Sequence, residues 1–465
     1  MNTAVTDSVS EELLRGYYES APRYTSYPGT DRFVEAFSIN DYTQALTVRR
    51  SSPAAMRLPL SLYVHVPFCE SSCYHCTSNK IVTKNHAPVK SYLQYLTREV
   101  ELTVSELGGV RRLGQFSLGG GTPTFFSNSE LGKLMAMLRR NFSFSVGAGC
   151  AIDIDPRTVD SSRLEALAQL GFNRLNFGVH DFDPEVQNAV HRVQPAAQVL
   201  GLIKTARELG FESIGVELTC GLPKQNRDSF ERTLAQVIES GPERIALYAY
   251  THLPERFKAQ RRIDAEHVPA EAVKIAIRAR AMSTLLGAGY VYVGMDQFAL
   301  PTDAMARAKR QGRLHRNFQG YSTQADCDLI GLGVSSVSRI GATYSQNAKN
   351  LDEYYDILDQ GRFPVVSGLH LTRDDLIRRA VIMALICQGE VVFESIEVAH
   401  LVNFQKYFAA ELLALHDMVA RGLVTVSDVA ITVTPAGFLV MAAVAMVFDH
   451  YLQRDRARAR FSQII

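Results

Sequence analysis

Three cysteines lie within eight residues of one another, and their spacing constrains this chain more than any other feature. They follow an apolar, β-branched run at 60–66 that predicts a buried strand, and they are Cys69, Cys73 and Cys76. Structural zinc sites use four Cys or His ligands in two separated pairs, so zinc fits only if His65 or His75 completes the set. Closely spaced thiolates are the ligands of iron–sulfur clusters. We therefore predict a cluster held by three thiolates, which leaves one iron open to another ligand.

The remaining features of the cysteines also favour a metal site over disulfides. Glu70, Ser71 and Ser72 make the loop polar, which disfavours packing of the thiols as small apolar side chains. Seven cysteines are an odd number, and three in one loop argue against a disulfide framework and for a reducing compartment. The others are expected to be buried packing residues: Cys150, Cys220, Cys327 and Cys387.

A repeated strand-and-helix pattern follows the N-terminal 55 residues. The predicted strands are 61–66, 115–118, 150–154, 174–178, 213–218 and 244–248. Helical patterns follow them, for example at 89–107, 129–140 and 196–209. Six such units predict parallel strands joined by right-handed crossovers, in either a doubly wound sheet or a full or partial barrel.

Polar residues gather where these strands end. The cysteine loop follows the first strand and Gly119-Gly-Gly-Thr-Pro123 follows the second, while later strand ends carry Asp153, His180, Glu217 and Thr251. In barrel enzymes the chemistry lies at the carboxyl ends of the strands. The pattern therefore predicts a single site on one rim.

The rest of the chain divides into three further parts. Residues 1–55 are expected to form an irregular arm with short helices, and 56–300 form the catalytic unit. Residues 301–369 are expected to connect the catalytic unit to the C-terminal domain and to cover the substrate. Glycines at 330–336 let the backbone approach a ligand. Residues 370–465 predict a mainly helical C-terminal domain, with a strand pair at 422–426 and 430–433 and a helix from Pro435.

Composition favours a small soluble substrate. The 465 residues carry a net charge of +1, with both signs interspersed, so no field attracts nucleic acid or an anionic membrane. No apolar run reaches the length of about 18 residues that a membrane-spanning helix needs, and the first residues lack the pattern of a secretory signal. We expect a cytoplasmic protein.

The C-x3-C-x2-C spacing is the signature of radical S-adenosylmethionine (SAM) enzymes, and other segments narrow the resemblance. From about residue 15 to the C-terminus the chain resembles the oxygen-independent coproporphyrinogen III oxidase family. The segments that carry this resemblance include Pro22-Arg-Tyr-Thr-Ser-Tyr-Pro28, Gly119-Gly-Gly-Thr-Pro123, Gly171-Phe-Asn-Arg-Leu175, Gly221-Leu-Pro-Lys-Gln225 and His315-Arg-Asn-Phe-Gln-Gly-Tyr321.

The resemblance implies an α/β fold with a partial (β/α)6 radical SAM barrel, an N-terminal arm and a mainly helical C-terminal domain. It implies that two propionates of coproporphyrinogen III become vinyl groups, giving protoporphyrinogen IX in haem biosynthesis. A low-potential electron donor such as flavodoxin or ferredoxin and a monomeric state are expected. A tetrapyrrole with four propionates also needs cations around an apolar pocket, and Arg23 and Arg316 are our candidates.

The resemblance also implies a role for each cofactor-binding position. Cys69, Cys73 and Cys76 are expected to hold a [4Fe-4S] cluster. The residues expected to line a first SAM are Tyr63, Gly120, Asp153 and Val337. Those expected to line a second SAM are His75, Gly121, Thr122, His180, Arg192, Glu217 and Thr251.

The chain departs from the family pattern mainly at the second SAM. Ser78 stands where the family usually has a fourth cysteine, and Asp153 replaces a Glu of the first SAM site. At the second, His75, His180, Glu217 and Thr251 replace Phe, Gln, Asp and Ala. We predict that radical initiation is retained and that the second site is weakened or repurposed. Two other functions stay open, namely a diverged radical SAM enzyme for another substrate and a haem or porphyrin carrier with His75 or His180 as haem ligand.

Overall fold

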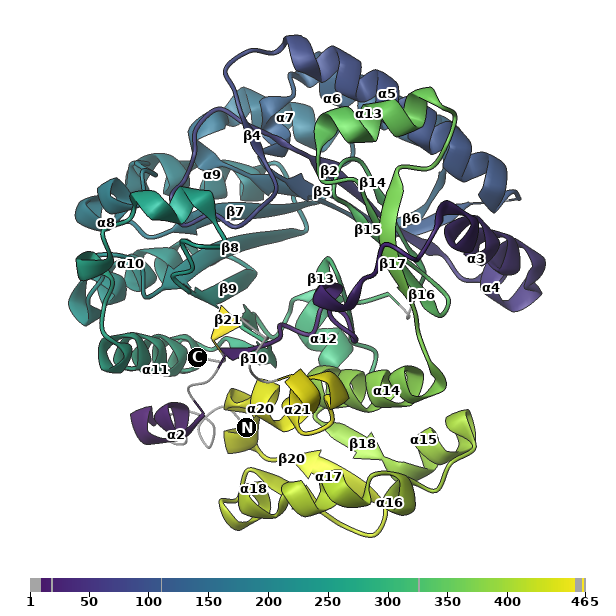
Figure 1. Ribbon diagram of the computed structural model, residues 1–465. Helices are drawn as coiled ribbons and strands as arrows, with labels where there is room; N and C mark the ends of the chain where they lie inside the picture. The colour runs from purple at the N-terminus through teal and green to yellow at the C-terminus, as the bar shows by residue number, and fades with distance from the viewer. Residues whose placement is uncertain (1–9, 18–19, 110, 325–326, 456–461, 464–465) are drawn as a thin grey trace.

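A twelve-stranded sheet organises the chain (Figure 1). The structure is a computed structural model that describes residues 10–17, 20–109, 111–324, 327–455 and 462–463. The strand order is β10-β11-β9-β8-β7-β6-β5-β2-β14-β15-β16-β17. In that order the bounds are Val291–Gly294, Gln297–Ala299, Arg244–Ala249, Ser213–Cys220, Arg174–His180, Ser143–Ile154, Arg112–Gly120, Leu60–Val66, Leu329–Leu332, Val337–Ile340, Thr343–Asn347 and Val365–His370.

The six predicted strands form the parallel centre of this sheet. They are β2, β5, β6, β7, β8 and β9, each paired in parallel with the next. The sheet is curved but does not close, because β2 pairs with β14 on its other side and β9 pairs with β11 (Figure 1). The α/β fold and the partial barrel are therefore confirmed, whereas periodicity alone also allowed a closed barrel.

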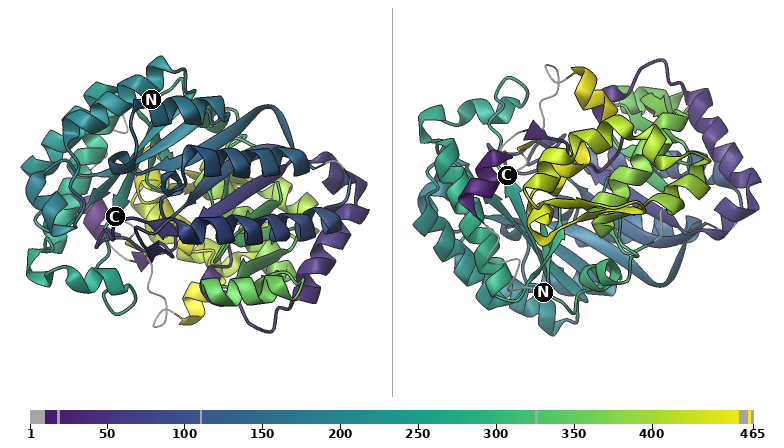
Figure 2. Two further views of the ribbon diagram at one scale, coloured as in Figure 1. Left: turned by 90° about the horizontal axis from the view of Figure 1, so that it is seen from above. Right: turned by 90° about the horizontal axis from the view of Figure 1, so that it is seen from below.

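Helices between the parallel strands cover the outer face of the sheet (Figure 2). Their sequences combine an apolar stripe with polar caps: in α6, Ser127 and Glu130 form a capping box, and Leu131 and Leu134 are buried. The predicted helices are confirmed. The bounds are α5 Ala87–Leu107, α6 Asn128–Asn141, α7 Ser161–Gln169, α8 Pro184–Ala189, α9 Ala196–Glu208, α10 Arg227–Ser240 and α11 Glu271–Gly287.

The segment expected only to connect and cover also extends the sheet. Strand β14 pairs in parallel with β2, with Leu329 opposite Ser61, and β15, β16 and β17 follow as antiparallel strands. The sequence analysis assigned no strand here. Gly331 permits the β14–β15 approach, because a Cβ there would lie 2.4 Å from the Val337 carbonyl oxygen. The other elements of this segment are α12 Ala304–Arg310, β12 His315–Asn317, β13 Gly320–Ser322 and α13 Leu351–Asp359.

The N-terminal arm contacts both the edge of the large sheet and the C-terminal domain. Val34 forms a bridge to Gly368 in β17, and the Tyr24 hydroxyl donates to Asp449 near the C-terminus at 3.1 Å. Arg49 is buried and pairs with Asp328, just before β14, at 2.5 Å. The bounds are α2 Glu11–Gly16, β1 Ser20–Ala21, α3 Ile39–Ser51 and α4 Pro53–Arg57; β1 pairs with β21, Ser462–Gln463.

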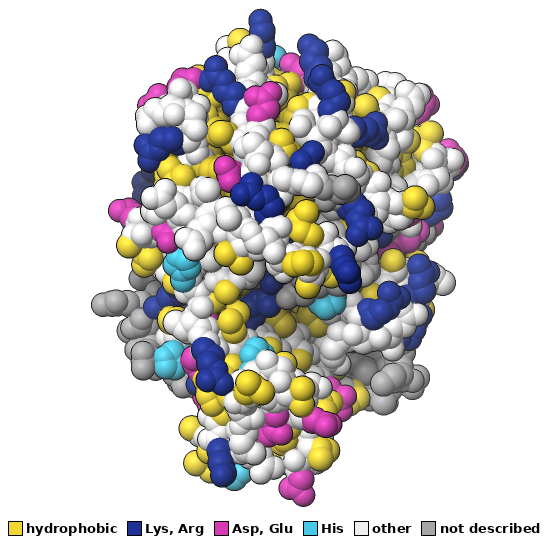
Figure 3. All heavy atoms as spheres, turned by 90° about the vertical axis from the view of Figure 1, so that its right-hand side faces the viewer, with side chains coloured by type: hydrophobic (Ala, Val, Ile, Leu, Met, Phe, Trp, Pro, Cys, Tyr) yellow, Lys and Arg dark blue, Asp and Glu magenta, His cyan; other side chains and the backbone are white. Residues whose placement is uncertain are grey.

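The C-terminal domain is mainly helical and lies against the open side of the sheet (Figures 1 and 2). The predicted strand pair is confirmed as antiparallel β19 and β20, and β18 joins it. Both charge signs are mixed on the face in Figure 3, and hydrophobic side chains are exposed on its lower part. Among the residues described, no helix is long and apolar enough to cross a membrane. The bounds are α14 Arg373–Gln388, β18 Glu390–Val392, α15 Phe393–His400, α16 Phe404–Tyr407, α17 Ala409–Ala414, α18 His416–Ala420, β19 Val424–Val426, β20 Ala430–Val433, α19 Pro435–Leu439, α20 Met441–Met446 and α21 His450–Asp455.

Candidate active site

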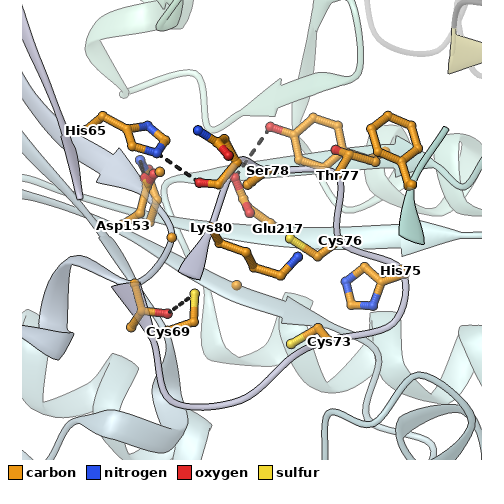
Figure 4. A pocket seen from close by; sticks show the side chains of 18 of the residues that line it. His65, Cys69, Cys73, His75, Cys76, Thr77, Ser78, Lys80, Asp153 and Glu217 are labelled. Carbon is orange, nitrogen blue, oxygen red and sulfur yellow. Dashed lines mark hydrogen bonds between the residues drawn. The ribbon is translucent and has the colours of Figure 1, made fainter. Parts of the chain in front are cut away.

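A cavity of about 880 Å³ opens at the carboxyl ends of the parallel strands (Figure 4). The loops after β2 and β5 and the ends of β6, β7 and β8 all reach it, as the single-rim prediction required. Its lining includes every residue predicted to bind the cluster or SAM: Tyr63, Cys69, Cys73, His75, Cys76, Gly120, Gly121, Thr122, Asp153, His180, Arg192, Glu217, Thr251 and Val337.

Backbone hydrogen bonds hold the cysteine loop against the strand ends. β3 (Phe68–Cys69) pairs with β4 (Ile81–Val82), which closes the loop at its base. The Gly121 amide donates to the Val66 carbonyl at 2.7 Å, and the Thr122 amide donates to the Phe68 carbonyl at 2.8 Å. A Cβ at Gly121 would lie 2.7 Å from the Phe68 oxygen, so this approach requires glycine. The glycine loop thus positions the first cysteine.

The donor set around the thiols fits an iron–sulfur cluster. None of the seven cysteines is in a disulfide, and the three of the loop face a common space in Figure 4. The Thr122 hydroxyl donates to Cys69 Sγ at 3.3 Å, while Arg157 and Arg192 donate to Cys73 Sγ at 3.3 and 3.2 Å. Such donors suit sulfur that carries negative charge. Burial raises the pKa of the Cys69 thiol to about 11, a barrier that iron overcomes by binding the thiolate.

A single metal ion fits less well. The described residues contain no group of three or more His, Cys, Asp and Glu side chains placed to hold one ion. Thiolates on separate irons of a cluster lie farther apart than ligands that share an ion. The ring nitrogens of His65 contact the Tyr63 hydroxyl at 3.2 Å and the Asn79 carbonyl at 3.0 Å. Zinc completed by His65 is therefore not supported.

The side predicted for the first SAM is shaped by backbone. Gly120 has φ +109°, and a Cβ there would lie 2.6 Å from the His65 ring. A Cβ on Gly119 would lie 2.6 Å from Asp153 Oδ2. Asp153 accepts a hydrogen bond from Asn176 at 3.0 Å, and burial raises the pKa of its carboxyl. The glycines therefore let the His65 ring and the Asp153 carboxylate pack directly against the end of β5.

A buried glutamate supports the loop that carries Val337. Glu99 is 2% exposed and accepts from the Gly333 amide at 2.7 Å, from Tyr354 at 2.6 Å and from Asn347 at 2.6 Å. Burial raises the pKa of Glu99 to about 7 despite these donors. The network fixes the β14–β15 turn, and hence Val337, against α5.

The side predicted for the second SAM is occupied by contacts between its own side chains. The rings of His75 and His180 meet edge to face with centroids 4.6 Å apart, and His180 Nδ1 lies 3.1 Å from the Thr219 hydroxyl. His180 has φ +66° at a register shift between β7 and β8. Burial, then Arg192, lowers the pKa of His75 to about 3, and burial also lowers that of His180. Both rings are therefore neutral at physiological pH.

Arg192 and Glu217 complete this second side. The Arg192 guanidinium is buried and donates to the Gly178 carbonyl at 2.5 Å, to Asp155 at 3.2 Å and to Cys73. Glu217 accepts from the Tyr248 hydroxyl at 3.4 Å. Burial, reinforced by Asp153, raises the pKa of Glu217 to about 7. Protein groups thus take up part of this side's hydrogen-bonding capacity, while His75 Nδ1 and Arg192 Nε are buried without a hydrogen-bond partner among the described residues.

The two substrate candidates differ in position. Arg23 lines the cavity, with its guanidinium over the Tyr248 ring at 4.7 Å. Arg316 is 7% exposed and is not among the described lining residues; it donates to the Arg23 carbonyl at 3.1 Å. Arg316 therefore supports Arg23 instead of facing the cavity.

Several cavity residues were missed by the sequence analysis. Arg157 follows β6 directly, so its place at a strand end was a usable signal. Arg256 lies beyond β9 in a long loop, and its position has no comparable signal. The missed lining residues include Lys80, Arg157, Thr219, Tyr248, Arg256, Gln260 and Gln319.

Comparisons with known proteins agree with this geometry. Residues 63–237 match the Radical SAM superfamily, and 371–440 match the HemN C-terminal domain. The chain is 44% identical over 456 residues to the oxygen-independent coproporphyrinogen III oxidase of Pseudomonas aeruginosa, covering 98% of each chain. It is 42% identical to that of Escherichia coli, covering 97% of this chain and 98% of the other. The solved structure of the Escherichia coli enzyme, HemN, matches with a TM-score of 0.88 at 42% identity, over 92% of this chain and 97% of that one. The chain therefore belongs to the oxygen-independent coproporphyrinogen III oxidase family.

Proposed function

We propose that this protein converts two propionates of coproporphyrinogen III to vinyl groups without oxygen, giving protoporphyrinogen IX. The cofactors are a [4Fe-4S] cluster and SAM. The observation that carries the proposal is the thiol loop, which faces a large cavity. It lies in a chain that is 44% identical, over 98% of its length, to the oxygen-independent coproporphyrinogen III oxidase of Pseudomonas aeruginosa. When bound, the cluster and SAM supply a 5′-deoxyadenosyl radical that removes a hydrogen atom from the β-carbon of a propionate.

The residues of the chain then have distinct tasks. Cys69, Cys73 and Cys76 hold the cluster, and the glycines after β5 present backbone to SAM. The Arg23 guanidinium binds a propionate, and Arg316 holds Arg23 in place by donating a hydrogen bond to the Arg23 carbonyl. Each conversion releases carbon dioxide and leaves one electron for an external acceptor.

The partners and setting follow from this chemistry. We propose a flavodoxin or ferredoxin as the one-electron donor, because reduction of the cluster needs a low potential. A cytoplasmic monomer is also proposed; an odd number of cysteines, with three in one loop, suits a reducing compartment.

A diverged radical SAM enzyme for another substrate is the second candidate. The contact between His75 and His180 on the second side is the observation that favours it. A haem carrier that uses one of these rings as its ligand is a third, non-enzymatic candidate. It predicts tight haem binding and no 5′-deoxyadenosine when the protein is reduced with SAM.

An anaerobic assay separates these functions. The cluster-reconstituted protein is mixed with SAM, a low-potential reductant and coproporphyrinogen III, and 5′-deoxyadenosine and porphyrin products are followed together. Protoporphyrinogen with 5′-deoxyadenosine supports the oxidase. Deoxyadenosine without decarboxylation indicates another substrate. If neither product forms although the protein carries a full cluster, the carrier is favoured.

A further inference from the structure

We propose that Arg157 and Arg192, aligned by Asp155, raise the reduction potential of the cluster by donating hydrogen bonds to the Cys73 thiolate. This role rests on the presence of the cluster alone and is independent of the substrate. Arg157 was not among the predicted site residues, and it acts here as a positioning and tuning residue that touches a cluster ligand.

Two guanidinium groups converge on one sulfur. Arg157 Nη2 lies 3.3 Å from Cys73 Sγ, and Arg192 Nη1 lies 3.2 Å from it. By contrast, Cys69 Sγ accepts from the neutral hydroxyl of Thr122 at 3.3 Å. Charged donors make stronger hydrogen bonds than neutral ones. The hydrogen bonding around the thiols is therefore asymmetric, with two charged donors at Cys73 and a neutral donor at Cys69.

Asp155 holds both arginines in this position. Its Oδ2 accepts from Arg157 Nη2 at 2.6 Å and from Arg192 Nη1 at 3.2 Å, and its Oδ1 accepts from Arg157 Nε at 3.0 Å. The Asp155 side chain is 8% exposed. Although burial opposes ionisation, the two arginines lower the pKa of this carboxyl to about 2. One ionised carboxylate thus aligns two cations, and one net positive charge remains beside the sulfur.

This arrangement favours the reduced cluster. Addition of one electron increases the negative charge on the cluster and its sulfur ligands, while no bond to the protein forms or breaks. Hydrogen bonds to the sulfurs are among the factors that set the potential of iron–sulfur centres. Cations act strongly here because the Arg192 and Asp155 side chains are each only 8% exposed. The electron comes from the low-potential protein donor, and a higher cluster potential makes that transfer easier.

The test is redox titration of the reconstituted cluster in wild-type protein and three variants, monitored by electron paramagnetic resonance without substrate. Arg157→Gln removes the cation and shortens the side chain, so we expect the equilibrium constant for reduction to fall about tenfold, or ~59 mV for one electron. Arg157→Lys keeps the charge but lacks the planar fork, and we expect an intermediate value. Arg256→Gln is the matched control, because it removes a cation from the same cavity.

The outcomes are distinct. A lower potential in Arg157→Gln, partial recovery in Arg157→Lys and no change in Arg256→Gln support the proposal. An unchanged potential in Arg157→Gln with full iron content overturns the proposal. An equal shift in Arg256→Gln also overturns it, because the potential would then respond to the total positive charge of the cavity and not to the hydrogen bonds at Cys73. If Arg157→Gln binds less iron, the titration reports the potential of the clusters that remain, and an unchanged potential there also overturns the proposal. Failure of the decarboxylation assay leaves this measurement unaffected, so the two proposals fail separately.

Discussion

The two sides of the cavity are built by different means. On the first side, Gly119 and Gly120 pack directly against the Asp153 carboxylate and the His65 ring, because a Cβ on either glycine would lie 2.6 Å from them. On the second side, the rings of His75 and His180 contact each other, and Arg192 donates to Cys73, a predicted cluster ligand. The glycine positions admit no side chain and can change only with the local fold, whereas the contacts of the second side change by substitution. This difference explains how the second side can be remodelled while the glycine turn keeps its form.

The largest effect is expected when the cluster, which both sides of the cavity adjoin, is lost. Cys76→Ala leaves two thiolates, so the cluster should be lost and 5′-deoxyadenosine formation should fall by about 10³-fold or more. Iron content and product are measured together. Cys150→Ala is the control, since Cys150 is buried in β6 away from the loop, and it should retain iron. Full activity in Cys76→Ala would remove this residue from the ligand set.

The next effect tests the backbone wall. Gly120→Ala forces a side chain into a positive-φ position 2.6 Å from the His65 ring. Strain of about 1–3 kcal/mol should weaken SAM binding roughly 5- to 150-fold. Equilibrium binding of SAM to the reconstituted protein measures this. Gly132→Ala on α6, where a Cβ meets nothing within 4 Å, should bind like the wild type. Equal affinity in both variants would contradict a backbone-built first side.

A smaller effect is expected from restoring the second side. The variant that combines His75→Phe, His180→Gln, Glu217→Asp and Thr251→Ala carries the residues that the resemblance predicts for the family. We expect it to bind a second SAM about tenfold more tightly than the wild type, because the contact between the two histidines is removed. Isothermal titration gives the stoichiometry. His86→Phe, which alters a ring stacked on Phe125, is the control. Two SAM molecules per cluster in the wild type would refute a weakened site.

The last prediction concerns folding stability, which should affect the reaction least. It tests Glu99, the buried residue that holds the β14–β15 turn beside the first side. The folded-state pKa of Glu99 is raised to about 7, so its contribution to stability is complete at acid pH and is lost as pH rises through 7. From pH 5 to 8 the wild type should lose about 2 kcal/mol through this group, and Glu99→Gln should not. Thermal unfolding across this range measures the loss. Glu101→Gln, on the exposed face of α5, should keep the wild-type slope.

Local patterns predicted the site better than the outer sheet. The cysteine loop and the six parallel strands have strong local signals, and β6 merely begins earlier, at Ser143. Strands β14 to β17 were not predicted, because they are short and contain glycine and polar residues. Strand β14 also pairs with β2, which is distant in sequence, although β15 and β16 form a local hairpin. Glu99 was not among the predicted residues, and its partners Gly333, Asn347 and Tyr354 lie far along the chain. Long-range polar contacts of this kind leave no local pattern.

The pairing of β2 with β14 also has a consequence for the biosynthesis of the holoprotein. The strand that precedes the cysteine loop is flanked on one side by Leu329–Leu332, and Asn79 beyond the loop donates to the Lys349 carbonyl. Contacts between such distant segments form late, because closing a long chain segment is slow. A ribosome must therefore release most of the polypeptide before these contacts hold the loop. Until then the loop is restrained only by the earlier contacts of residues 66–122, so its three thiols can be supplied with a cluster before the sheet is complete.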